Sequence, residues 1–115
     1  MIRKFTLLAV AAGMASPAIA APVPEVGADG RLQVIVSYAD LDLASTAGAA
    51  AMQHRIRTAV RVVCPIIPGV AQVGVRMAEM QCASETSQRA NRQVDQLIAD
   101  AKAGRLASSY RVAVR

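Results

Sequence analysis

The two cysteines constrain the fold more than any other feature of this chain. Cys64 and Cys82 are the only cysteines in 115 residues, one at the end of an amphipathic helical pattern and the other early in the next. A disulfide between them would hold the two helices together as a hairpin and would stabilise the fold by about 3 kcal/mol. A redox-active pair is a weaker interpretation, because catalytic cysteines usually lie two residues apart at a helix start, where the dipole favours the thiolate. We therefore predict a structural disulfide.

The first twenty residues have the pattern of a secretory signal peptide. Arg3 and Lys4 form a basic start, residues 5–14 form an apolar stretch, and Ala18-Ile19-Ala20 is a small-residue cleavage site. The apolar stretch is too short to span a bilayer, so we expect cleavage after Ala20 and no transmembrane segment in the mature chain. The pattern predicts a periplasmic or secreted protein, in a compartment where disulfides form.

Removal of this leader changes the composition on which the fold depends. The formal charge falls from +5 to +3, because two of the thirteen basic residues lie within the leader. Tyr38 and Tyr110 are then the only aromatic residues, so the core must be built from aliphatic side chains. A small core of this kind commonly needs a disulfide or a second subunit. The scarcity of aromatic side chains for base stacking, together with the exported address, predicts no nucleic-acid partner.

The first half of the mature chain predicts a strand followed by a helix. Residues 21–30 contain two prolines and two glycines and are expected to form a flexible lead-in. Residues 31–38 alternate between polar and apolar side chains, as a half-buried strand does. Ser45 is placed to cap a helix over residues 46–63. Pro65 ends that helix, because proline disfavours helical backbone at the preceding residue.

The second half predicts a longer helix and a second strand. Residues 66–74 contain the turn dipeptide Pro68-Gly69 and are apolar enough to fold back onto the hairpin. A helix is expected over residues 75–103, ending before Gly104. Residues 109–115 alternate again and predict a strand. The apolar positions of this helix recur every three or four residues and are expected to face the first helix: Met80, Ala83, Ser87, Ala90, Val94, Leu97, Ile98 and Ala101.

These elements predict a single α+β domain over residues 31–115, in the order β-α-α-β. Its frame is a disulfide-stapled antiparallel helical hairpin with a small two-stranded antiparallel sheet. Such a sheet is marginal by itself and leaves two open edges. A second copy of the chain or a strand from another protein could complete it. We therefore expect possible self-association as a homodimer, through the strand edges or through residues 66–75.

The sequence also resembles a known family. The residues that carry the resemblance are the run from Val36 to Leu43, then Gly48, Arg55-Ile56, Ala59, Val60, Val63-Cys64 and Cys82-Ala83. The similarity covers roughly residues 31–90 and the leader, and the family is the UrcA family of small exported bacterial proteins. The resemblance implies a signal-bearing, two-cysteine domain with no assigned activity. The chain departs from the family pattern at Pro65, where glycine is common, and in its strand-like tail.

Two sets of residues are candidates for catalysis or metal binding. His54 is the only histidine, and nothing in its helix supplies the partner that acid–base catalysis or a zinc site would need. Asp40 and Asp42 could hold a calcium ion weakly, but a calcium loop needs six or more oxygen ligands. The simpler interpretation is that these acids start a turn near the positive end of the first helix. We predict no catalytic, metal or cofactor residues.

Three arginines of the first helix form a candidate anion-binding patch. Arg55, Arg57 and Arg61 could meet phosphate, an anionic lipid or an acidic partner, although a solvated surface is the simpler role. The expected function is that of an exported, non-enzymatic structural or protein-interaction module. The alternative is a binding protein for an anionic partner, such as a lipid headgroup or an acidic polymer, through this patch. A minor enzymatic role for His54 is a third hypothesis.

Overall fold

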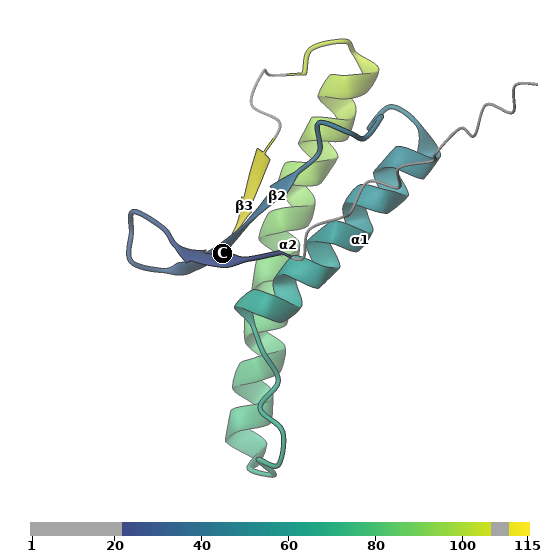
Figure 1. Cartoon of the computed structure of the whole chain (residues 1–115). Coiled ribbons are helices and arrows are strands. Elements are labelled where there is room, and N and C mark those ends of the chain that lie inside the picture. Colours follow the sequence, from purple (N-terminus) through teal and green to yellow (C-terminus); the bar gives the residue numbers. More distant parts are fainter. Residues whose placement is uncertain (1–21, 107–110) are drawn as a thin grey trace, which may run out of the picture.

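The fold is an α+β arrangement of two helices and three strands within residues 22–106 and 111–115, the part of the chain that the computed structural model describes. The order is β1 (Pro24–Val26), β2 (Leu32–Ser37), α1 (Thr46–Val63), α2 (Val73–Lys102) and β3 (Arg111–Val114). The helices form an antiparallel hairpin that covers one face of the sheet (Figure 1). The predicted fold class is therefore confirmed. The predicted signal peptide and Tyr110 lie outside the described residues.

The sheet is antiparallel, with the strand order β1-β2-β3. The two predicted strands are β2 and β3, and they pair as expected, with Val34 opposite Val114 and Val36 opposite Val112. The lead-in was expected to lack structure, and this expectation was wrong, because β1 pairs with β2 from Pro24 opposite Val34 to Val26 opposite Leu32. A three-residue edge strand that is exposed throughout has no burial pattern to reveal it, and its proline is tolerated because it begins the strand at an edge.

Local signals in the sequence determine where α1 begins and ends. The hydroxyl of Ser45 accepts a hydrogen bond from the Gly48 N–H at 3.0 Å, which is the predicted N-cap. The Asp42 carboxylate accepts from the Ala44 N–H at 3.1 Å, which holds the preceding turn. The helix ends at Val63, as the position of Pro65 predicts.

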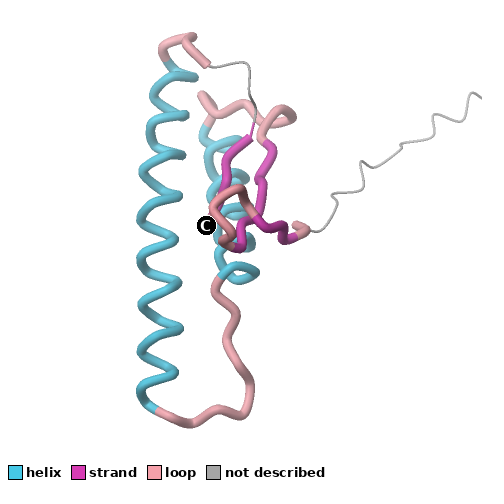
Figure 2. Tube along the Cα trace, turned by 90° about the vertical axis from the view of Figure 1, so that its left-hand side faces the viewer, coloured by secondary structure: helices cyan, strands magenta, loops and turns pink. Residues whose placement is uncertain are grey.

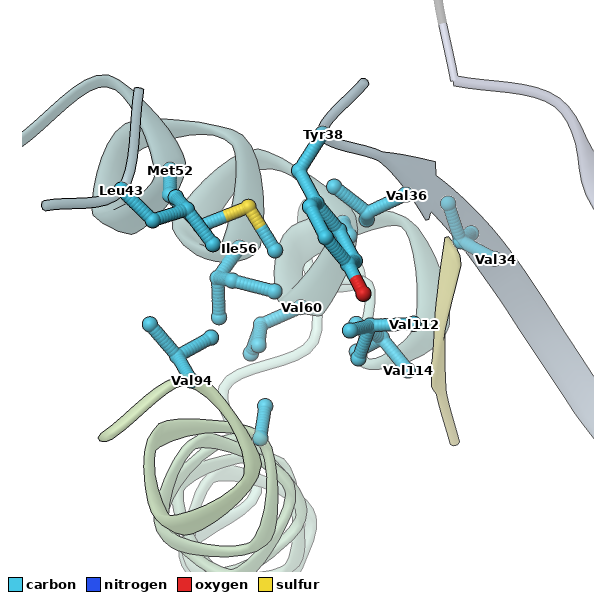
Figure 3. Close-up of a cluster of buried hydrophobic side chains, with 12 residues drawn as sticks. Val34, Val36, Tyr38, Leu43, Met52, Ile56, Val60, Val94, Val112 and Val114 are labelled. Carbon is cyan, nitrogen blue, oxygen red and sulfur yellow. The ribbon is translucent and has the colours of Figure 1, made fainter. Parts of the chain in front are cut away.

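The core lies between the hairpin and the sheet (Figure 3). The strands contribute alternate side chains, and Tyr38 follows β2 with its ring turned towards the strands. α1 contributes the predicted stripe, and α2 contributes Ala90 and Val94. The largest fully buried side chains are Tyr38, Leu43, Met52, Ile56, Val34, Val94 and Val114.

The stripe predicted on α2 is wrong at its first position, Met80. Ala90 and Val94 are buried, and Ala83, Leu97, Ile98 and Ala101 pack against the core, but Met80 is 72% exposed. The prediction for Met80 was wrong because α1 does not reach it. With 18 and 30 residues, the two helices measure about 27 Å and about 45 Å, so the first turns of α2 extend beyond α1 (Figure 2).

The disulfide joins the two helices near the point where α1 ends. Cys64 and Cys82 are bonded, with their Cα atoms 5.8 Å apart. Cys64 is buried, and its sulfur lies 3.5 Å from the hydroxyl of the buried Thr86. A disulfide sulfur carries no proton, so the Thr86 hydroxyl is the donor. The cross-link thus closes the core at the end where α1 stops.

No helix in the described part of the chain has the length and apolar character needed to cross a membrane.

Gly48 is required by the close approach of the turn before α1. A Cβ atom at this position would overlap the backbone carbonyl oxygen of Asp42. We predict that Gly48→Ala lowers the free energy of unfolding by about 1–3 kcal/mol, a usual range for overpacking. The measurement is the urea midpoint followed by far-ultraviolet circular dichroism.

Gly74→Ala is the matched control, because a Cβ at this helical glycine meets nothing within 4 Å. Alanine has the higher helix propensity, so the midpoint of this control should stay the same or rise. Equal midpoints for the two variants would contradict the packing described at Gly48.

Candidate functional site

The structure does not bring the three arginines of the predicted patch together as one open surface. The Arg55 guanidinium donates to both carboxylate oxygens of Asp40, at 2.8 and 2.6 Å, and to the Ser37 carbonyl oxygen at 2.8 Å. Arg55 is therefore a clamp between α1 and the end of β2, and its side chain is only 23% exposed. Arg57 and Arg61 remain exposed, one helical turn apart.

The Asp40–Arg55 pair has a clear electrostatic signature. Hydrogen bonding to Arg55 is the largest effect on Asp40 and lowers the pKa of its carboxyl from 3.8 to about 2. The same interaction raises the pKa of Arg55. Asp40 is thus part of the fold, and its carboxylate is already paired with a cation.

The other polar candidates are an exposed histidine of α1 and a carboxylate of the turn before it. His54 lies exposed on α1 in the same row as Arg57 and Arg61. The Asp42 carboxylate is used in the turn before α1. Within residues 22–106 and 111–115, no group of three or more histidine, cysteine, aspartate or glutamate side chains is placed to hold a metal ion.

The clearest surface feature is an apolar groove at the end of the hairpin. It has a volume of about 420 Å³ and lies between the last turn of α1, the loop that follows it and the first turns of α2. The disulfide forms part of its wall. Its lining residues are Val60, Arg61, Cys64, Ile66, Arg76, Glu79, Met80 and Ala83.

Large apolar side chains surround this groove and are exposed to solvent. Ile66 is 70% exposed, and the side chains of α2 that precede the disulfide are exposed to a similar degree. We call this set the apolar end of the hairpin; it consists of Ile66, Ile67, Val73, Met77 and Met80. Residues 66–74 were expected to fold back onto the hairpin, but Ile66 and Ile67 stay exposed, because within residues 22–106 and 111–115 no helix or strand lies beyond α1 to cover them.

The loop between the helices is nevertheless held in place. The Glu79 carboxylate accepts from the Ile67 N–H at 2.8 Å and from the Arg76 guanidinium at 2.8 Å. The hydrogen bond from Ile67 is the main cause that lowers the pKa of Glu79, and Arg76 adds to it. The Glu79 side chain is only 10% exposed, so this carboxylate is a fixed structural anchor.

Charge is distributed unevenly around the apolar end. No charged residue occurs over residues 62–75. The charged residues that flank this segment are Arg57 and Arg61 before it and Arg76 and Glu79 after it. Because Glu79 is paired with Arg76, the unpaired charges beside the apolar end are positive.

Comparison with protein-family models, curated proteins and solved structures finds no match for this chain. The resemblance to the UrcA family therefore stays a prediction.

The sequence indicated residues 66–75 as a possible self-association segment, but it did not extend that exposed surface to Met77 and Met80 on α2. Periodicity marked Met80 as an apolar position of a helix, but periodicity alone does not say how far the opposing helix extends. The difference between the expected lengths of the two helices was the signal that could have located it. The Asp40–Arg55 pair had no comparable signal, since its members lie 15 residues apart in different elements.

The lowered pKa of Asp40 predicts a pH dependence of stability. The ionised form is favoured in the folded state, so its contribution is fully present above about pH 4 and is lost as the pH falls from about 4 to about 2. We expect Asp40→Asn to reduce stability at neutral pH and to flatten the fall in stability across this window. Urea midpoints at neutral pH, at about pH 4 and at about pH 2 measure both effects.

Arg55→Gln removes the other member of the same ion pair. It should likewise reduce the loss of stability between about pH 4 and about pH 2. If Asp40→Asn lost as much stability as the wild type between about pH 4 and about pH 2, the pair would not link folding to protonation.

Proposed function

We propose that this chain is an exported, non-enzymatic interaction module whose contact surface is the apolar end of the hairpin. The observation that carries the proposal is the exposure of Met77 and Met80 beside the groove, on the part of α2 that precedes its packing against the core. Monomeric proteins seldom leave a contiguous apolar surface uncovered unless it binds something. The leader pattern and the disulfide support an exported address.

The chemistry of the groove favours binding over catalysis. Its lining is apolar apart from Arg61, Arg76 and Glu79. Both oxygens of Glu79 accept hydrogen bonds, and its lowered pKa makes it a weak base. Binding of an apolar surface needs no titrating group, so this environment suits an interaction module.

The alternative of an anionic partner has one specific observation in its favour. Arg57 and Arg61 are exposed on α1, and Arg61 also lines the groove. Arg55 takes no part, because Asp40 occupies its guanidinium. In this alternative the binding surface is the pair Arg57 and Arg61 at the rim of the apolar end.

A photo-crosslinking residue at position 80 tests the proposed surface in the cell. We expect a reproducible adduct when the residue replaces Met80 in the exported protein, because this side chain would contact the partner. Position 92 is the matched control, since Arg92 is exposed on the same helix but lies far from the apolar end. Mass spectrometry of the adduct identifies the molecule bound. Absence of an adduct at position 80, or the same adducts at both positions, would contradict the proposal.

A further inference from the structure

We infer that the apolar end of the hairpin binds the surface of an anionic lipid bilayer. This inference rests on the proposed function and names its partner. Three properties of the apolar end carry it: its position in the molecule, the sign of the charges beside it, and the nature of its backbone.

The position of the apolar end suits a flat surface. Ile66 and Ile67 lie in the loop between the helices, and Val73 and Met77 lie in the first two turns of α2. Figure 2 shows that this loop and these turns form one extremity of the molecule, away from the sheet. An apolar extremity can enter a bilayer surface while the rest of the domain stays in water.

The charges beside the apolar end favour an anionic surface over a second copy of the chain. Arg57 and Arg61 are exposed, and Glu79 is the only acidic residue between positions 57 and 80. Glu79 is already paired with Arg76. Two copies joined through this end would therefore bring arginines together without an unpaired acid to meet them, whereas phosphate groups of anionic lipids would neutralise them.

The backbone of the loop limits how deep the apolar end can go. Residues 65–72 are not helical, and their backbone N–H and C=O groups need water or polar headgroups. Insertion is therefore restricted to the boundary between headgroups and acyl chains, about 5–10 Å deep. Arg61 would then lie at headgroup level, and Arg57 would lie one turn, about 6 Å along the helix, further from the bilayer.

The test is binding of the purified, disulfide-bonded protein to lipid vesicles. The preparation is one whose mass shows that residues 1–20 have been removed, because an apolar leader would itself bind lipid. We expect binding to phosphatidylglycerol vesicles and much weaker binding to phosphatidylcholine vesicles. Binding should weaken when salt is raised from about 0.1 M to about 1 M, which shortens the Debye length from about 10 Å to about 3 Å.

Two pairs of matched variants locate the contact. Arg61→Gln should weaken binding about fivefold, the usual contribution of one basic residue near an anionic surface, whereas Arg92→Gln should change it by less than about twofold. Ile66→Thr should weaken binding strongly, whereas Val26→Thr, at a similarly exposed residue of β1, should not. All four side chains are exposed, so the variants should fold, and circular dichroism checks this.

Several outcomes would overturn the inference. Equal binding to both lipids, or equal losses with Arg61→Gln and Arg92→Gln, would show that the apolar end and its arginines do not recognise an anionic surface. A dimer that Met80→Gln disrupts would identify a second copy as the occupant. Failure to bind lipid together with a protein adduct at position 80 would leave the interaction module standing with a protein partner. Failure to bind lipid without any adduct would remove both proposals.

Discussion

The bond between Cys64 and Cys82 is the constraint on which the rest of the structure depends. It joins Cys64, the C-cap residue of α1, to Cys82, the tenth residue of α2. The bond therefore fixes the point at which the two helices stop packing side by side. On one side of this bond lies the core, which is closed by Cys64 and the hydroxyl of Thr86. On the other side α2 continues without an opposing helix, and its apolar residues reach solvent. One cross-link therefore separates the part of the chain that stabilises the fold from the part available for binding.

The exposed end is also a fixed surface. Glu79 ties the backbone of Ile67 to α2 and is itself held by Arg76. A binding surface that is already ordered loses little conformational entropy when it meets its partner, so more of the contact energy contributes to affinity. The disulfide acts in the same direction, because it restricts the ends of the loop. The stability of the core and the order of the proposed binding surface thus depend on the same few contacts around the end of α1.

The sequence predicted most of the fold, because its signals are local. Ser45 and Pro65 marked both ends of α1, and the alternation after residue 31 marked β2. It failed where the outcome depends on distant parts of the chain. Whether Met80 is buried depends on how far α1 extends, and whether Arg55 is free depends on Asp40 in the turn after β2. The candidate site consists largely of such cases: its apolar residues were identified, but their exposure and the loss of Arg55 from the basic patch required the three-dimensional arrangement.

The apolar end of the hairpin is uncovered while the core beside it is closed. Oxidation of methionines by hydrogen peroxide, followed by mass spectrometry of the folded protein, tests this claim most directly. Met52 is fully buried, whereas Met77 and Met80 are 65% and 72% exposed, so the protein contains its own control. We predict rapid oxidation of Met77 and Met80 and slow oxidation of Met52. Protection of Met77 and Met80 to the level of Met52 in the isolated protein would contradict it.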